Sequence, residues 1–175
     1  MDRKKQQYFI ALGSNIHPED NIISMLNALF NITDKVDVSE IMRTEPVGLK
    51  SDKYFLNTVV RIETDKDRPT LKSTFNLIEE SLGRDRSNLD RKYKDRTADL
   101  DILFSLPMEA DFADKALFDQ EGIYITNPLL ILLKHLNYQT NMEHKVDHYP
   151  RIKLSFEDTL IGLQAVTLHP QLINK

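Results

Sequence analysis

The chain has 175 residues, of which 41% are hydrophobic and 29% are charged, so it is long enough to bury the core of one domain. It contains no cysteine, which excludes disulfides, thiolate metal sites and a cysteine nucleophile. A net charge of -4 argues against a protein that holds nucleic acid by bulk charge, so any anion site must be local.

The N-terminal residues Met1–Gln7 are charged, and they lead into only about five apolar residues before Gly13, which is too short for a signal peptide. No other run approaches the length of a membrane span. We therefore expect a cytoplasmic protein that binds neither membrane nor nucleic acid and is a monomer.

The first predicted strand is Tyr8–Leu12, and it ends in a Gly-Ser-Asn turn. Gly13 allows the backbone there to approach a ligand closely. Pro18 then opens a helix whose apolar positions, three and four residues apart, form one buried face. Those positions are Ile22, Met25, Leu26 and Leu29.

The second predicted strand runs from Val36 to Met42 and leads into an irregular loop containing Pro46 and Gly48. The third, Tyr54–Ile62, presents Leu56, Thr58, Val60 and Ile62 on one face and Phe55, Asn57, Val59 and Arg61 on the other.

Asn57 is an unusual residue type for a strand. Its paired donor and acceptor are suited to reading the edge of a heterocycle. Taken alone, a role in capping a neighbouring loop is the better reading, by roughly two to one.

A second helix begins after Asp67 and ends at Gly83, with Leu71, Phe75, Ile78 and Leu82 on its buried face. A basic run from Arg84 to Lys94 follows. Such a charge-balanced stretch is ordinarily a solvated connector.

The strand that begins at Asp99 changes that reading. Its alternation places Leu100, Ile102 and Phe104 toward the core and Asp99 and Asp101 together on the opposite face. The two carboxylates lie roughly 6 to 7 Å apart on such a strand, so they repel unless a cation or an arginine with a bound anion neutralises them. The pattern predicts a site for a metal and a phosphate.

The order strand, helix, strand, strand, helix, strand over residues 8–104 predicts an α+β, ferredoxin-like βαββαβ core with a four-stranded antiparallel sheet and both helices on one face. The first and last strands would then lie side by side in the centre, with Gly13 next to Asp99, and a site on the open face. We expect one domain over residues 1–175, in which residues 105–175 form an extension.

In the extension we expect a loop with a short helix over Leu106–Gln120, a short strand over Ile123–Ile125, an apolar helix over Pro128–Leu136 and an amphipathic segment over Phe156–Leu168. Between them, His144 and His148 could ligate a metal if helical. With no third ligand and Pro150 nearby, two solvated histidines are favoured.

Five segments together resemble the hydroxymethyldihydropterin pyrophosphokinase family of folate biosynthesis. They are Ala11-Leu12-Gly13-Ser14-Asn15, Arg43-Thr44-Glu45-Pro46-Val47-Gly48, Phe55-Leu56-Asn57, Gly83-Arg84-x-Arg86 and Arg96-Thr97-Ala98-Asp99-Leu100-Asp101-Ile102-Leu103. The resemblance implies transfer of a pyrophosphoryl group from ATP to the hydroxymethyl group of a reduced pterin, with release of AMP.

The resemblance also implies roles for individual residues. Asp99 and Asp101 would hold two magnesium ions that bridge the ATP phosphates, and Arg84 and Arg96 would grip the phosphates, so that these four are the catalytic set. Glu79 and Arg86 would lie near the nucleotide. Phe55 would stack on the pterin and Asn57 would hydrogen-bond its ring. Residues Asp85–Asp95 would form a lid that contains Tyr93. The remaining substrate-binding residues would be Gly13, Thr44 and Val47.

The chain departs from the family pattern after Ser105. A Pro-His-Pro segment aligned on Thr126-Asn127-Pro128 places Asn127 where the family has histidine. The family also has an arginine and a phenylalanine after that segment. When they are aligned on Glu121-Gly122-Ile123, this chain has Glu121 in place of the arginine and Ile123 in place of the phenylalanine. Tyr124 is then a candidate for the second stacking aromatic.

Three hypotheses follow. The first is an active magnesium-dependent pterin pyrophosphokinase, in which either the two metals lower the pKa of the attacking hydroxymethyl group or one aspartate accepts its proton. The second is a non-catalytic relative that binds pterin or nucleotide. The third is another metal-dependent phosphotransferase or nuclease, and the modest acidity of the chain argues against a polynucleotide substrate.

Overall fold

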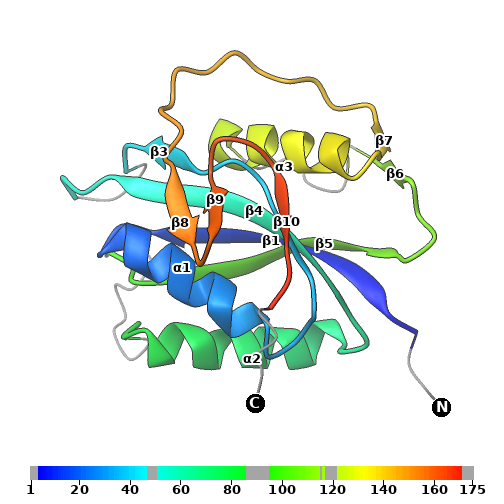
Figure 1. Cartoon of the computed structure of the whole chain (residues 1–175), viewed down its shortest axis with the longest axis horizontal. Coiled ribbons are helices and arrows are strands. Elements are labelled where there is room, and N and C mark those ends of the chain that lie inside the picture. The colour runs from blue at the N-terminus through cyan, green and yellow to red at the C-terminus, as the bar shows by residue number, and fades with distance from the viewer. Residues whose placement is uncertain (1–3, 47–50, 86–94, 115, 117–121, 171–175) are drawn as a thin grey trace.

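The computed structural model describes residues 4–46, 51–85, 95–114, 116 and 122–170. A central sheet separates two layers of helices, with α1 and α2 on one side and α3 on the other (Figure 1). In chain order the elements are β1 (Gln6–Ser14), α1 (Pro18–Leu29), β2 (Val36–Val38), β3 (Met42–Thr44), β4 (Phe55–Thr64), α2 (Arg68–Ser81), β5 (Asp99–Pro107), β6 (Phe112–Ala113), α3 (Ile123–His135), β7 (Gln139–Thr140), β8 (Leu154–Phe156), β9 (Thr159–Ile161) and β10 (Val166–Leu168).

Within the described residues the main sheet has six strands, in the order β10-β2-β4-β1-β5 with β3 also paired to β4, and the pairs are antiparallel. The prediction of four strands is therefore wrong. The expected second strand divides into β2 and β3 around Ser39–Ile41, and β10 from the extension joins β2.

The predicted neighbourhood of Gly13 and Asp99 is confirmed, because the two residues are paired in the β1–β5 register. The prediction that the strand carrying Asp99 and Asp101 lies at the centre of the sheet is wrong. Among the described strands β5 lies at the end of the sheet rather than at its centre. Its outer edge is therefore accessible to side chains from α2.

The first core layer is the one that the helical spacing predicts. All four predicted apolar residues of α1 are fully buried, and so are Leu71 and Phe75 of α2. They pack against Ile10, Leu12 and Leu100 of the sheet. Asp67 caps α2 by accepting a hydrogen bond from the Thr70 amide, and Gly83 ends it with φ +89°. Local sequence signals were sufficient for this layer.

The opposite face of the sheet is not fully open. Helix α3 packs on it through Leu129, Leu130, Leu132 and Leu133, which contact Phe9 and Val59. The prediction of a short strand over Ile123–Ile125 is wrong, since these residues form the first turn of α3. Pro128 lies inside this helix instead of beginning it.

Phe104 also lies on this second face, contrary to the prediction. The β1–β5 register shifts so that Ile10 pairs with Ile102 but Phe9 pairs with Phe104. Leu103 is the extra residue of the bulge, and it reverses the alternation beyond it. Phe104 consequently stacks on Phe9, with ring centroids 4.6 Å apart.

The expected amphipathic segment Phe156–Leu168 is not a single element. It contains the end of β8, all of β9 and all of β10, and only β10 belongs to the main sheet. No helix in the part of the chain described here combines the length and apolar character needed to cross a membrane.

Candidate functional site

One cavity lies at the end of β1, between β5, the β3–β4 pair and the first turn of α3. Its volume is about 250 Å³. The predicted site residues that line it are Gly13, Thr44, Phe55, Asn57, Arg96, Asp99 and Asp101. Residues from four strands, separated by up to 88 positions in the sequence, therefore meet in one place, as Gly13 and Asp101 illustrate.

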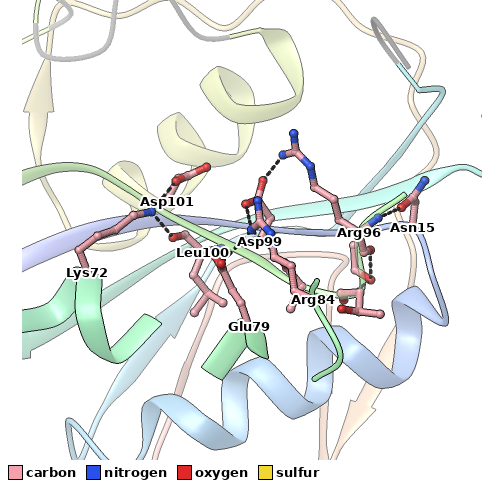
Figure 2. A network of polar contacts seen from close by, with 11 residues as sticks. Asn15, Lys72, Glu79, Arg84, Arg96, Asp99, Leu100 and Asp101 are labelled. Carbon is pink, nitrogen blue, oxygen red and sulfur yellow. Dashed lines mark hydrogen bonds and ion pairs between the residues drawn. The ribbon is translucent and has the colours of Figure 1, made fainter. Parts of the chain in front are cut away.

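Asp99 lies between two arginines. Its Oδ1 accepts a hydrogen bond from Nη1 of Arg84, and its Oδ2 accepts one from Nη1 of Arg96 (Figure 2). The Asp99 side chain is only 17% exposed. Two guanidinium groups thus offset the cost of placing this carboxylate in a partly buried position.

Arg84 is held in place by Glu79. The Arg84 guanidinium lies 2.9 Å from Oε2 of Glu79 and also donates to the Ala98 carbonyl. Burial lowers the pKa of Arg84, but the charges of Asp99 and Glu79 outweigh it, so the net pKa is raised and Arg84 stays protonated.

Glu79, for which a nucleotide contact is predicted, is not among the residues that line the cavity, and that contact stays a prediction. The side chain is 0% exposed, and its Oε1 accepts a hydrogen bond of 2.8 Å from the Leu100 amide. Both carboxylate oxygens are therefore bonded within the protein, between α2 and β5. Glu79 is a positioning residue for Arg84 and for the start of β5.

Asp101 is the more exposed of the two acids, with 59% of its side chain accessible. Nζ of Lys72, on α2, lies 2.9 Å from its Oδ1 (Figure 2). Lys72 was missed in the sequence because a lysine there is indistinguishable from any solvated helix residue. Only the packing of α2 beside β5 identifies it.

The segment that carries Arg96 is anchored by Asn15. The Asn15 side chain accepts a hydrogen bond of 2.6 Å from the Arg96 amide and donates one of 2.7 Å to Asp95. Ser14 adds a hydrogen bond to the Thr97 carbonyl. The turn after β1 therefore places Arg96 at the cavity.

Asp95, the residue before Arg96, is engaged in the same anchor. A hydrogen bond from Ser51 is the main cause that lowers its pKa, burial opposes it, and Lys53 and Asn15 add to the lowering. Nζ of Lys53 lies 3.1 Å from Asp95. The Asp95 charge is thus balanced locally.

The opposite part of the cavity is formed by an amide, a hydroxyl and aromatic rings. Nδ2 of Asn57 donates to Oγ1 of Thr44 at 2.9 Å, across the β3–β4 pair. Asn57 thus bonds to a neighbouring strand instead of capping a loop, and it also lines the cavity, while its contact with a heterocycle stays a prediction.

Tyr124 and Ile125 of α3 complete the lining, together with Glu45, Ala11, Leu12 and Leu103. Tyr124 is the aromatic that the sequence offered as a second candidate for stacking. Phe55 and Tyr124 approach the cavity from β4 and α3 respectively. Ile125 and Glu45 were missed, although Glu45 lies inside a motif that was recognised.

Three predicted site residues, Val47, Arg86 and Tyr93, lie outside the described residues. His144 and His148 lie in a segment without regular secondary structure, and the described residues contain no group of three or more His, Asp or Glu side chains able to hold a metal.

The donor set at Asp99 and Asp101 fits magnesium. Mg²⁺ is usually held by one or two carboxylates, with water and substrate phosphates completing its shell, so a third protein ligand is not required. Both carboxylates line the cavity, and Arg96 beside them offers charge for a phosphate. The arrangement can bind a metal–phosphate group at one side and a heterocycle at the other.

Comparison with known proteins agrees with this geometry. Residues 9–130 match the family model of 7,8-dihydro-6-hydroxymethylpterin-pyrophosphokinase. Two similar proteins are named 2-amino-4-hydroxy-6-hydroxymethyldihydropteridine pyrophosphokinase. The one from Bacillus subtilis is 39% identical over 54% of this chain and 57% of its own length. The one from Haemophilus influenzae is 34% identical over 54% of this chain and 59% of its own length. The folic acid synthesis protein fol1 of Schizosaccharomyces pombe is 29% identical over 94% of this chain and 24% of its own length. The chain thus spans little more than half the length of its bacterial relatives.

Proposed function

This chain belongs to the 7,8-dihydro-6-hydroxymethylpterin-pyrophosphokinase family, and we propose that it transfers a pyrophosphoryl group from ATP to the hydroxymethyl group of 6-hydroxymethyl-7,8-dihydropterin. The substrate oxygen would bond to the β-phosphorus of ATP as the bond from that phosphorus to the oxygen of AMP breaks. AMP leaves, and the hydroxyl proton is released.

One observation carries the proposal. The acids and the arginine suited to a metal and phosphates line the same cavity as the amide and aromatic rings suited to a heterocycle. Transfer between a phosphate ester and an alcohol depends mainly on in-line positioning and charge neutralisation, so both halves must meet.

The cavity volume supports separate places for the two substrates. About 250 Å³ lies just below the range of roughly 300–1,000 Å³ typical of small-molecule pockets. It accommodates one fused ring system better than a ring system and a whole nucleotide. We therefore place the pterin between Asn57, Phe55 and Tyr124, with the ATP phosphates at the Asp99 and Asp101 side.

Each residue then has a chemical task. Asp99 and Asp101 would hold the two magnesium ions, which when bound neutralise phosphate charge and lower the pKa of a coordinated oxygen. Arg96 would bind a phosphate oxygen, and Arg84 would orient Asp99. Asn57 would hydrogen-bond the ring edge. Because all these groups come from one chain, we propose that a monomer is sufficient.

The test measures AMP by chromatography after incubation with ATP, Mg²⁺ and the reduced pterin. The wild type should form AMP only when pterin is present, and Asp99→Asn should lower the rate by at least about 100-fold. Asp158→Asn, in the exposed turn between β8 and β9, is the matched control and should retain the wild-type rate.

Other outcomes would replace the proposal. Pterin or ATP binding by calorimetry without any AMP would identify a binding protein that lacks catalysis. ADP or inorganic phosphate as the product would identify a different phosphotransferase.

A further inference from the structure

Residues 141–150, here called the strap, connect β7 to β8 without forming a helix or strand. The strap runs past α3 on the side away from α1 and α2 (Figure 1). It lies outside residues 9–130, which match the family model.

At one end of its path the strap is bonded to Asn127 of α3, whose side chain is 0% exposed. Oδ1 of Asn127 accepts from the Lys145 amide at 3.0 Å, and Nδ2 donates to the Lys145 carbonyl at 2.7 Å and to Asp147 at 2.6 Å. Both amide hydrogens are therefore used within the protein. The residue aligned with the histidine of the family anchors the strap and does not line the cavity.

Asp147 continues the connection toward β3. Its side chain is 2% exposed, and Arg151 donates to both of its oxygens, at 2.5 and 3.1 Å. The same guanidinium donates to Oε1 of Glu40, two residues before β3, at 2.9 Å. The hydrogen bonds from Arg151 lower the pKa of Asp147 to about 2, so the carboxylate is charged at neutral pH.

Backbone contacts reinforce this end. The Arg43 amide donates to the Pro150 carbonyl at 2.9 Å, and the Ile152 amide donates to the Ile41 carbonyl at 2.9 Å. The strap is thus attached to the strand that carries Thr44, and its other contacts attach it to α3.

The two attached elements form facing parts of the cavity. Thr44 and Glu45 belong to or follow β3, and Tyr124 and Ile125 lie in the first turn of α3. The apolar contacts of α3 fall mainly in its second half, at Leu129, Leu130, Leu132 and Leu133. Asn127 lies three residues after Tyr124, a spacing that places the two side chains on adjoining parts of one helix face.

We propose that Asp147, bonded to Asn127 and Arg151, positions the first turn of α3 against β3 and thereby sets the affinity of the cavity for the pterin. The inference rests on the proposed function. Asp147 and Arg151 are positioning residues, because neither lines the cavity.

The test compares Asp147→Asn with Glu143→Gln, which removes an exposed acid from the same strap. Asp147→Asn should raise the KM for the pterin about tenfold, as expected for a loss of about 1.4 kcal/mol, while kcat and the KM for ATP change less than twofold. Calorimetry should show the same weakening of pterin binding. Arg151→Lys, which keeps the charge but loses the paired donors, should give a smaller rise in the pterin KM.

Equal changes in the KM of both substrates, a change in kcat alone, or no change would overturn the inference. If Asp147→Asn does not fold, Glu40→Gln removes only the charge that Glu40 presents to Arg151, and it should raise the pterin KM without changing that for ATP. Wild-type protein that neither forms AMP nor binds pterin would refute the proposed function instead, so the two failures are distinguishable.

Discussion

Gly13 and Asn57 are paired across β1 and β4, and a β-carbon on Gly13 would lie 3.2 Å from Oδ1 of Asn57. That separation is tighter than an ordinary van der Waals contact. The Asn57 amide can therefore occupy its position because residue 13 has no side chain. The amide then lines the cavity and donates to Thr44.

Gly13→Ala should therefore weaken pterin binding. The added methyl group would displace the Asn57 amide by a few tenths of an ångström, and we expect a rise in the pterin Kd of about threefold to tenfold with a loss of stability below about 1 kcal/mol. Calorimetry with the pterin and a thermal melt check the two parts. An unchanged Kd would show that the Asn57 amide does not contact the ring.

Glu79→Gln should destabilise the protein even without nucleotide. The substitution keeps an acceptor for the Leu100 amide but leaves Arg84 without one of its buried charge partners, at a cost of about 1–3 kcal/mol. Urea unfolding of the ligand-free protein measures this. Glu80→Gln, at the exposed neighbouring position, is the control and should change stability by less than about 0.5 kcal/mol. Equal stability of both variants would contradict the role of Glu79 in holding Arg84 in place.

Lys72→Met should tighten binding of a divalent cation. In the ligand-free protein the Lys72 ammonium neutralises Asp101, and a metal must displace it. Because both side chains are substantially exposed, the ion pair is worth at most about 1 kcal/mol, so we expect an increase in Mn²⁺ affinity of about twofold to fivefold. Electron paramagnetic resonance titration with Mn²⁺ measures it.

The control for Lys72→Met is Lys134→Met, which removes an exposed lysine from α3 and changes the net charge equally. Mn²⁺ affinity that rises in both variants would indicate an effect of net charge alone. Affinity that falls in Lys72→Met would show that Lys72 assists metal binding.

Asp147 should make stability depend on acid pH. Its pKa is about 2 in the folded protein against an ordinary value of 3.8, and the groups facing it are Arg151, Asn127 and, through Arg151, Glu40. The depressed pKa means that the stabilisation is complete above about pH 4 and is lost as the pH falls through about 2.

The measurement is the free energy of unfolding in urea between pH 2 and pH 7 for the wild type and Asp147→Asn. The difference between them should be about 2 kcal/mol above pH 4, as expected for a pKa lowered from 3.8 to about 2, and should shrink toward pH 2. A difference that stays constant down to pH 2 would contradict the assignment.

Short-range patterns in the sequence determined the first core layer. The spacing of apolar residues identified the buried faces of α1 and α2, and Asp67 and Gly83 marked the ends of α2. The alternation after Asp99 and the order of the elements also placed Gly13 beside Asp99. These features follow from helix and strand periods and from capping, which act over a few residues.

Tertiary structure alone decided the features that depend on distant partners. Phe104 changes face because Leu103 forms a bulge against β1, and Ile123–Ile125 is helical because α3 buries Leu129 and its neighbours on the sheet. Other features depend on contacts between residues 20 to 111 positions apart in the sequence. These are the contacts of Lys72 with Asp101, of Glu79 with Leu100, of Asn127 with Asp147, and of Arg151 with Glu40. Such contacts depend on which surfaces the folded chain brings together, and no local propensity encodes them.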